Sequence, residues 1–335
     1  MLKRFSALIG LMLVSQAHGM NIDLGPAIGY NIFVKENFTQ PGADSQGKIA
    51  IGGNANIGQY DVGVNYDQSY NAPGIPFWKD VNGNADVLVV GGNLKTTGWG
   101  NIKGNAIVGG TVTDASGHSA KGTITQATPI DFNAAFTYLS NLSTSLQNLT
   151  KNVTVDFKYN NWLLLTPDAQ LSNDGVLVTE ISGSMLKNAT DLSAPQINAD
   201  DTLVINVSGK NIHFDSLNYG ARENLGALHL SPSHILYNFF EAENITFDYG
   251  GFYGNILAPN ANFTFQSGDL SGQVIAKSWT GNWGAQANLW DGFFVPPVTP
   301  EPPVASVAEP NPIYILLIGV LGIIYIRRKN VKFKK

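Results

Sequence analysis

Cysteine is absent from the chain, and charged residues are few. None of the 335 residues is a cysteine, and Asp, Glu, Lys and Arg make up only 13% of them. Without cysteine the protein has neither disulfides nor thiol chemistry, so packing and hydrogen bonds alone must hold it together. That requirement suits a large regular β structure better than a small cross-linked module.

Positive charge is scarcer still away from the two ends. Of the 20 Lys and Arg residues, two lie at the N-terminus and six in the C-terminal tail, which leaves 12 against 25 acidic residues and a net charge of −13 for the rest. An acidic surface is a poor electrostatic partner for nucleic acid or anionic lipid. We therefore expect no nucleic-acid partner.

Catalytic motifs are missing as well. The sequence contains no His-Glu-x-x-His or Gly-x-Ser-x-Gly motif, and its one arginine between the ends is Arg222. The best carboxylate pairs are Asp200-Asp201 and Glu241 with Glu243, of which only the second pair would share one face of a strand. We predict a protein that is not an enzyme. An extracellular polysaccharide lyase or hydrolase, which would use such carboxylates, is the alternative.

The first 19 residues have the order of an export signal. Lys3 and Arg4 precede the apolar run 5–14, and Ala17-His18-Gly19 places small residues where a signal peptidase cleaves. The sequence therefore predicts a signal peptide over residues 1–19 and an exported mature chain.

The C-terminal end consists of a spacer, an apolar segment and a basic tail. Seven prolines in residues 295–312 favour an extended linker. The uncharged run 313–326 precedes six basic residues in 327–335, which should stay cytoplasmic under the positive-inside rule. We predict a transmembrane or sorting helix at 313–326, so that the protein is either membrane-anchored or released after sorting, and a folded extracellular domain over residues 20–294.

The folded domain is rich in Gly, Asn, Thr and Val, and its apolar residues come in short runs. The runs 48–51, 87–90 and 106–108 have the length of a strand, contain β-branched residues and are followed by glycine. One segment differs, because apolar residues recur every three or four positions over 131–149. This spacing predicts an amphipathic helix there, with Asp131 near its start.

Two pairs of similar segments are each offset by 18 residues. The sequence VGGN at 90–93 returns as VGGT at 108–111, and GNILA at 254–258 returns as GQVIA at 272–276. A period of about 18 residues fits one coil of a β-solenoid with three short strands, in which stacked Asn side chains satisfy backbone groups of neighbouring coils. We predict a mainly β fold, a right-handed β-solenoid (β-helix) flanked by the helix. A β-sandwich with Gly-rich hairpins is the alternative.

Several of these segments resemble a known family. LGPA at 24–27, GKIAIGGN at 47–54 and GNILAP at 254–259 are similar to bacterial choice-of-anchor A proteins, and the resemblance extends over nearly all of 22–290. It implies an extracellular adhesive domain with an ice-binding-like solenoid, carried by variable C-terminal anchors, and it implies no catalytic residues. The Ala308-Glu309-Pro310 sequence before the apolar run resembles the PEP-CTERM class of sorting signals, which implies a sorting machinery as a partner.

One loop is the best candidate for a metal site. Asp80, Asn82, Asn84 and Asp86 alternate in it, and oxygen ligands at alternate positions suit calcium. However, Gly83 stands at the fourth position rather than the sixth of a calcium loop, and no Glu follows at the twelfth. A turn rich in Asp and Asn without any metal is the alternative. We expect no other cofactor.

Aromatic and threonine residues offer two further candidates for ligand binding. Trp279, Trp283 and Trp290 would either stack against sugars or cap the last coil. Thr-x-Thr pairs at 111–113 and 123–125 suggest ice-binding rows, but they do not recur at the repeat spacing. We attribute eight Asn-x-Ser/Thr sequons to composition: Asn37, Asn141, Asn148, Asn152, Asn188, Asn206, Asn244 and Asn262.

Together these patterns predict an exported, surface- or membrane-anchored, adhesin-like protein that attaches to a cell-surface, matrix or exopolysaccharide ligand. The alternatives are the polysaccharide enzyme and an ice-binding protein. The partners that we expect are an extracellular polymer, the sorting machinery and the membrane.

Overall fold

The computed structural model describes residues 22–65, 83–114, 119–128, 130–158, 161–168, 175–219, 230–288 and 294. All of them belong to one unit, Met1–Val298, whereas the second unit, Thr299–Lys335, lies outside the described residues. The signal peptide (1–19), linker (295–312), apolar segment (313–326) and tail (327–335) that the sequence predicts also lie outside them. Among the described helices, none is long and apolar enough to cross a membrane.

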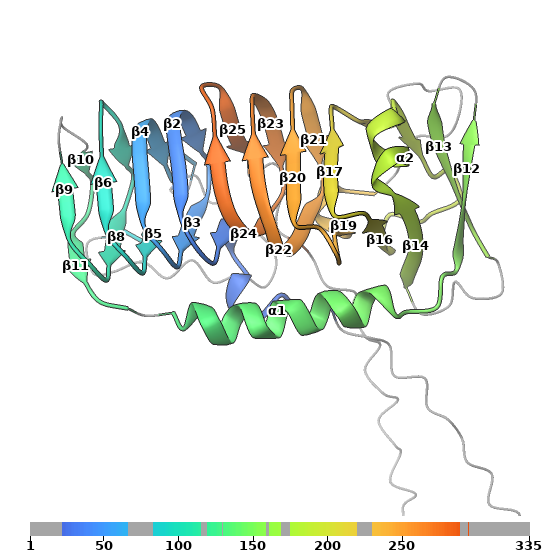
Figure 1. Ribbon diagram of the computed structural model, residues 1–335, viewed down its shortest axis with the longest axis horizontal. Coiled ribbons are helices and arrows are strands. Elements are labelled where there is room, and N and C mark those ends of the chain that lie inside the picture. Colours follow the sequence, from blue (N-terminus) through green and yellow to red (C-terminus); the bar gives the residue numbers. More distant parts are fainter. Residues whose placement is uncertain are drawn as a thin grey trace, which may run out of the picture. The chain divides into compact units, whose positions relative to one another are not determined.

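Short strands stacked in parallel make up the domain (Figure 1). Twenty-one strands join in one hydrogen-bonded sheet, which curls so that each coil of the chain passes three faces before the next coil begins. Neighbouring coils pair in parallel, as β14 (Val176–Ser182) does with β16 (Thr202–Ser208) over seven residue pairs. The mainly β solenoid is therefore confirmed, and the antiparallel sandwich is wrong.

Each of the three faces draws on strands from both halves of the chain. The first, here called the helix face, contains β14, β16, β1 (Tyr30–Val34), β3 (Lys48–Ile51), β5 (Asp86–Val90), β8 (Asn105–Val108), β11 (Ile124–Gln126), β19 (Ile235–Asn238) and the first halves of β22 (Asn255–Phe265) and β24 (Val274–Gly281). The second, the Asn/Thr face, contains the second halves of β22 and β24, the first halves of β2 (Phe38–Ser45) and β4 (Ala55–Val62), and β6 (Leu94–Thr96), β9 (Val112–Asp114), β17 (Asn211–Phe214) and β20 (Asn244–Phe247). The third face contains the second halves of β2 and β4, and β7 (Asn101–Ile102), β10 (Ser119–Ala120), β21 (Gly251–Tyr253), β23 (Gly268–Ser271) and β25 (Ala285–Asn288).

A smaller sheet and three short helices complete the described part. The sheet contains β12 (Val153–Lys158), β13 (Trp162–Pro167), β15 (Asp191–Ser193) and β18 (Asn218–Tyr219), of which only β12 and β13 pair antiparallel. The short helices are α2 (Gly183–Asn188) and the 3-10 turns η1 (Gly25–Ala27) and η3 (Pro232–His234). The helix α2 packs beside β14 and β17 at one end of the coils.

Alternation and repeated Asn side chains explain why these short strands stack. Residues such as Ile49 and Ile51 point into the coil and are buried. At the corners, the Asn93 side chain accepts a hydrogen bond from the Thr111 backbone at 2.8 Å, and Asn105 accepts one from Thr123 at 2.9 Å. Both pairs are 18 residues apart. The predicted period and the predicted role of stacked Asn are therefore confirmed.

The order of the coils along the stack differs from their order in the sequence. The first coil, with β1 and β2, lies between β24 of the last coil and β3 of the second (Figure 1). From there the chain builds outward to β11, returns along the stack as the long helix, and builds inward from β14 to β25. The N-terminal and C-terminal coils thus meet in the middle of one continuous surface.

The long helix α1 (Phe132–Gln147) packs along the helix face, which confirms the helix predicted over 131–149. Its N-cap is Asp131, whose carboxylate accepts from the Ala134 backbone N–H at 3.0 Å. The buried side of α1 includes Phe136, whose ring stacks on Phe33 of β1 with centroids 5.5 Å apart. The helix has no charge pairs of its own that would stabilise it, so its stability depends on this packing.

Candidate functional site

The Asn/Thr face presents one row of threonines toward the solvent. In the registers of the neighbouring strands, Thr246 pairs with Thr264, Thr264 with Thr280, and Thr280 with Thr39. Thr39 and Thr280 are exposed, and the other two are half-buried. Four identical side chains therefore repeat along the stack at the strand spacing of about 4.8 Å.

A second row, of Asn and Ser, runs beside the threonines. The Asn262 side chain donates to Asn244 at 3.2 Å and accepts from the Ser278 hydroxyl at 2.9 Å. On the other half of the face, the backbone N–H of Asn54 donates to the Asn37 side chain at 2.9 Å. Because each amide is held by the next coil, the row presents fixed donors and acceptors to the solvent.

The two rows arise from a repeated Asn-x-Thr or Ser-x-Thr motif. It occurs at 37–39, 244–246, 262–264 and 278–280, and in each case the middle residue is apolar and buried, whereas the flanking two point outward. Three of the eight sequons, those at Asn37, Asn244 and Asn262, coincide with this motif. The signal was available in the sequence, because 244 and 262 are 18 residues apart.

The Thr-x-Thr pairs that the sequence suggested do not form such a row. Thr113 extends the threonine row only at its far end, after Asn56 and Lys95 have interrupted it. Thr125 lies on the helix face, paired with Ile107. The threonines that align are Thr246, Thr264 and Thr280 of three successive C-terminal coils, together with Thr39 of the first coil, which lies beside them only in the folded stack.

The predicted calcium loop is only partly described. Asp80 and Asn82 lie outside the described residues, and Asn84 is half-buried. The exposed Asp86 accepts a hydrogen bond from the Asn105 side-chain amide at 3.2 Å, so it takes part in the contacts between coils. A calcium site at this loop stays a prediction.

A different group of side chains has the donor set of a metal site. His213, Asp215 and Asp248 lie at one end of the Asn/Thr face, with one donor atom of each within 4.8 Å of the others. The His213 Nε2 atom contacts the Asp248 carboxylate, and one Asp215 oxygen is buried without a hydrogen-bond partner. One imidazole and two carboxylates are a donor set that zinc accepts. The sequence did not reveal this group, because Asp248 comes from a different coil than His213 and Asp215.

The three predicted tryptophans differ in position. Trp279 is 1% exposed, with its ring stacked between Phe38 and Phe263 at centroid distances of 5.9 and 5.3 Å. It cannot offer a face to a sugar, so the prediction for this residue is wrong. Trp283 is 60% exposed and stays a candidate, whereas Trp290 lies outside the described residues.

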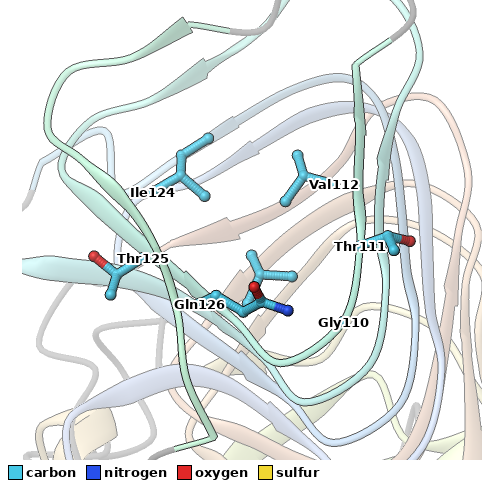
Figure 2. Close-up of a pocket in the computed structure, with 7 residues that line it drawn as sticks. Gly110, Thr111, Val112, Ile124, Thr125 and Gln126 are labelled. Atoms are coloured by element: carbon cyan, nitrogen blue, oxygen red, sulfur yellow. The ribbon is translucent and has the colours of Figure 1, made fainter.

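The carboxylates considered for catalysis are engaged in contacts between coils. Glu241 accepts from the Gly209 backbone N–H at 2.7 Å, and Glu243 pairs with Lys210 at 2.7 Å. Figure 2 shows an open pocket at the other end of the stack, where Val112 of β9 and Ile124 of β11 face each other. The residues that line this pocket include no acid and no base. Neither place pairs a general acid with a nucleophile.

Comparison with solved structures finds ice-binding proteins that are similar to this chain at low sequence identity. An ice-binding protein from the Antarctic ascomycete Antarctomyces psychrotrophicus is 13% identical, with 80% of this chain and 97% of that chain covered and a TM-score of 0.37. An ice-binding protein from Shewanella frigidimarina is 12% identical, with 81% and 98% covered and a TM-score of 0.38. Similarity at this level carries no argument about function, and the fold is established by the strand pairing itself.

No curated protein matches the chain. A family model described as "Putative Ice-binding-like adhesive domain" matches residues 23–287, which is most of the chain and nearly all of its described part. The chain therefore belongs to this family of ice-binding-like adhesive domains.

Proposed function

We propose that the protein is an extracellular adhesive protein and that the Asn/Thr face binds a repetitive ligand. The observation that carries this proposal is the repeat of the same outward Asn or Ser and Thr on neighbouring strands. Donors and acceptors at a constant spacing pair best with a ligand that repeats too, such as a polymer chain or an ordered solid surface. Family membership supports the adhesive reading.

The location outside the cell forms part of the same proposal. An adhesive domain meets its ligand outside the cell, and the sequence adds an N-terminal export signal and a C-terminal apolar segment with a basic tail. We propose that residues 1–19 are removed on export, and that 313–335 anchor the protein in the membrane or are read by a PEP-CTERM-type sorting machinery. The choice-of-anchor A resemblance supports this arrangement.

Substitutions in the middle of the threonine row test the binding surface. Thr264→Arg and Thr280→Arg place bulky charges in the face, and we expect each to weaken retention on the ligand by roughly tenfold or more, as at a binding hot spot. The matched control is Thr137→Arg on the exposed side of α1. Retention of the full chain is measured on immobilised cellulose, mixed-linkage glucan, alginate and collagen, with released sugars assayed in the same wells.

Three outcomes of this assay contradict the proposal. If the wild-type protein adheres to none of the four materials, the proposed adhesive function is wrong. If the variants Thr264→Arg and Thr280→Arg adhere as well as wild type, the Asn/Thr face is not the binding site. Released oligosaccharide would replace the adhesin by the polysaccharide lyase or hydrolase.

Ice is the second candidate ligand, and the threonine row is the observation that favours it. Each threonine presents a methyl group and a hydroxyl, and four of them repeat in register on neighbouring parallel strands. If the face binds ice, the wild-type chain will show thermal hysteresis and slow the recrystallisation of ice, and Thr264→Tyr will abolish most of both effects. Hysteresis no larger than that of Thr264→Tyr would exclude ice and leave the polymer.

A further inference from the structure

Three large aromatic side chains lie exposed at one corner of the solenoid. Trp99, Trp283 and Tyr249 are 75%, 60% and 61% exposed, more than any other large hydrophobic residue in the described part of the chain. Each lies where its coil turns from the Asn/Thr face to the third face: Trp99 after β6, Trp283 after β24 and Tyr249 after β20. Single exposed aromatics are common on proteins, but three at the same corner of different coils define a feature, here called the aromatic corner.

The registers show that the two tryptophans occupy extra positions in this corner. Four residues lie between Ile57 and Val62, whereas five lie between their partners, Thr96 and Ile102. Two residues lie between Phe265 and Gly268, whereas three lie between Gly281 and Ala285. Each longer turn contains one of these exposed tryptophans, so neither indole is needed to fill the core.

The ring of Trp283 is held in place by a glycine of the next coil. A Cβ atom at Gly42 would lie 2.2 Å from Trp283 Cε3, so the six-membered ring lies directly against the Gly42 backbone. Gly42 is buried beneath this ring, while the ring itself remains mostly exposed. A ring supported on one side and open on the other is a preformed stacking surface, which lowers the entropy lost on binding.

Polar side chains of the third face run beside the aromatic corner. Asp269 pairs with Gln286 in register, and Asp44 pairs with Asp61. The Gln286 amide donates to both oxygens of Asp44, at 3.3 and 3.2 Å. Burial raises the pKa of the Asp44 carboxyl, the hydrogen bond from Gln286 opposes this rise, and the charges of Asp61 and Asp269 add to it. The four residues form an acidic column, in which Asp61 also accepts hydrogen bonds from Asn101 and lies 3.8 Å from the Lys103 ammonium group.

The spacing of the aromatic rings favours a linear ligand along the stack. Trp283 is two coils from Tyr249 and three coils from Trp99, which corresponds to about 10 and 14 Å at the usual strand spacing. A pyranose unit of an extended glycan is close in length to one strand spacing. Exposed rings stack on the C–H faces of sugars, and carboxylates accept hydrogen bonds from sugar hydroxyls. The same carboxylates, on an acidic domain, repel an anionic polymer.

We propose that the aromatic corner binds a linear, uncharged polysaccharide laid along the solenoid axis, with the acidic column accepting hydrogen bonds from its hydroxyl groups. This inference rests on the proposed adhesive function, and it names the class of polymer and the residues that bind it. The Asn/Thr face borders the same corner, so both surfaces contact one chain.

Affinity electrophoresis of the full chain through gels with soluble mixed-linkage glucan tests the proposal. We expect wild-type protein to be retarded, and Trp99→Ala/Trp283→Ala to lose roughly tenfold or more in affinity, as for central aromatic anchors. The matched control is Phe157→Ala, an exposed aromatic on β12. Tryptophan fluorescence supplies a second readout, because glucan should shift the emission of wild type but not of the double variant. Circular dichroism confirms that each variant is folded.

The outcomes separate this inference from the proposed function. A double variant that binds glucan like wild type overturns the aromatic corner, and the adhesive function stands if Thr264→Arg still reduces retention. Wild-type protein that is retarded by alginate but not by glucan overturns the uncharged ligand in favour of an acidic one. Retention on collagen alone overturns the polysaccharide and keeps the adhesin, whereas retention on nothing removes both.

Discussion

Replacing Trp279 with alanine is expected to lower the free energy of unfolding by about 4 kcal/mol, the range seen when a large buried aromatic is removed. Its indole stacks on Phe38 and Phe263 and meets Phe265 edge-on at 5.6 Å. Its Nε1–H donates to the buried Gln40 side chain at 2.8 Å, so alanine also leaves that oxygen without this donor. These contacts join the first coil to the last, and the cavity would open at their junction.

Urea unfolding followed by circular dichroism measures this loss. Trp279→Phe should lose less, because the phenyl ring still fills part of the space although the hydrogen bond is gone. Trp283→Ala, four residues away, is the matched control, and its stability should stay within about 0.5 kcal/mol of wild type. If Trp279→Ala were as stable as wild type while it lost ligand binding, the indole would belong to a binding surface after all.

The second large effect is expected at the buried polar contact between α1 and the helix face. Asn238 donates to the Ser143 carbonyl at 2.8 Å and to Asn206 at 2.7 Å, and it accepts from the Ser143 hydroxyl at 2.6 Å. Asn206 in turn donates to the Leu146 carbonyl at 3.1 Å. Asn238→Leu removes three of these bonds and buries the groups that made them, so we expect a loss of about 3 kcal/mol.

A triple variant separates two contributions to the lost stability: the free-energy cost of buried polar groups without hydrogen-bond partners, and the cost of changing the shape of the packed side chains. Asn206→Leu, Ser143→Ala and Asn238→Leu together replace most of the polar side chains of the contact, and we expect them to recover part of the stability that Asn238→Leu alone loses. Hydrogen exchange should show that Asn238→Leu speeds the opening of α1 more than the opening of the coils beneath it. Equal and additive losses from the three single changes would argue against a coupled network.

Local patterns predicted much of this fold because the physics behind them is local. The helix at 132–147 follows from apolar residues at helical spacing behind an Asp cap, and these act over one or two turns. The coil length follows from the 18-residue offset, because stacked coils of equal length keep their Asn residues in register. Short apolar runs followed by glycine predicted the strands β3, β5 and β8 for the same reason.

The two tryptophans show where local patterns fail. Trp279 and Trp283 are four residues apart, so an unbroken strand would place both side chains on one face. The strand ends at Gly281, and the longer corner that follows turns Trp283 outward while Trp279 stays in the core. Only the pairing with neighbouring coils reveals that extra residue.

The sequence by itself determined the class of fold, the coil length, the flanking helix and the acidic character of the domain. Only the tertiary structure decided that the first coil inserts between the last coil and the second, and therefore that Thr39 stands in line with Thr280, Thr264 and Thr246. Parallel pairing joins strands that are far apart in the chain. Each of these strands offers similar apolar side chains and a similar hydrogen-bonding edge to its neighbours. The choice of neighbour depends on the whole stack, including the long helix that carries the chain from one end to the other.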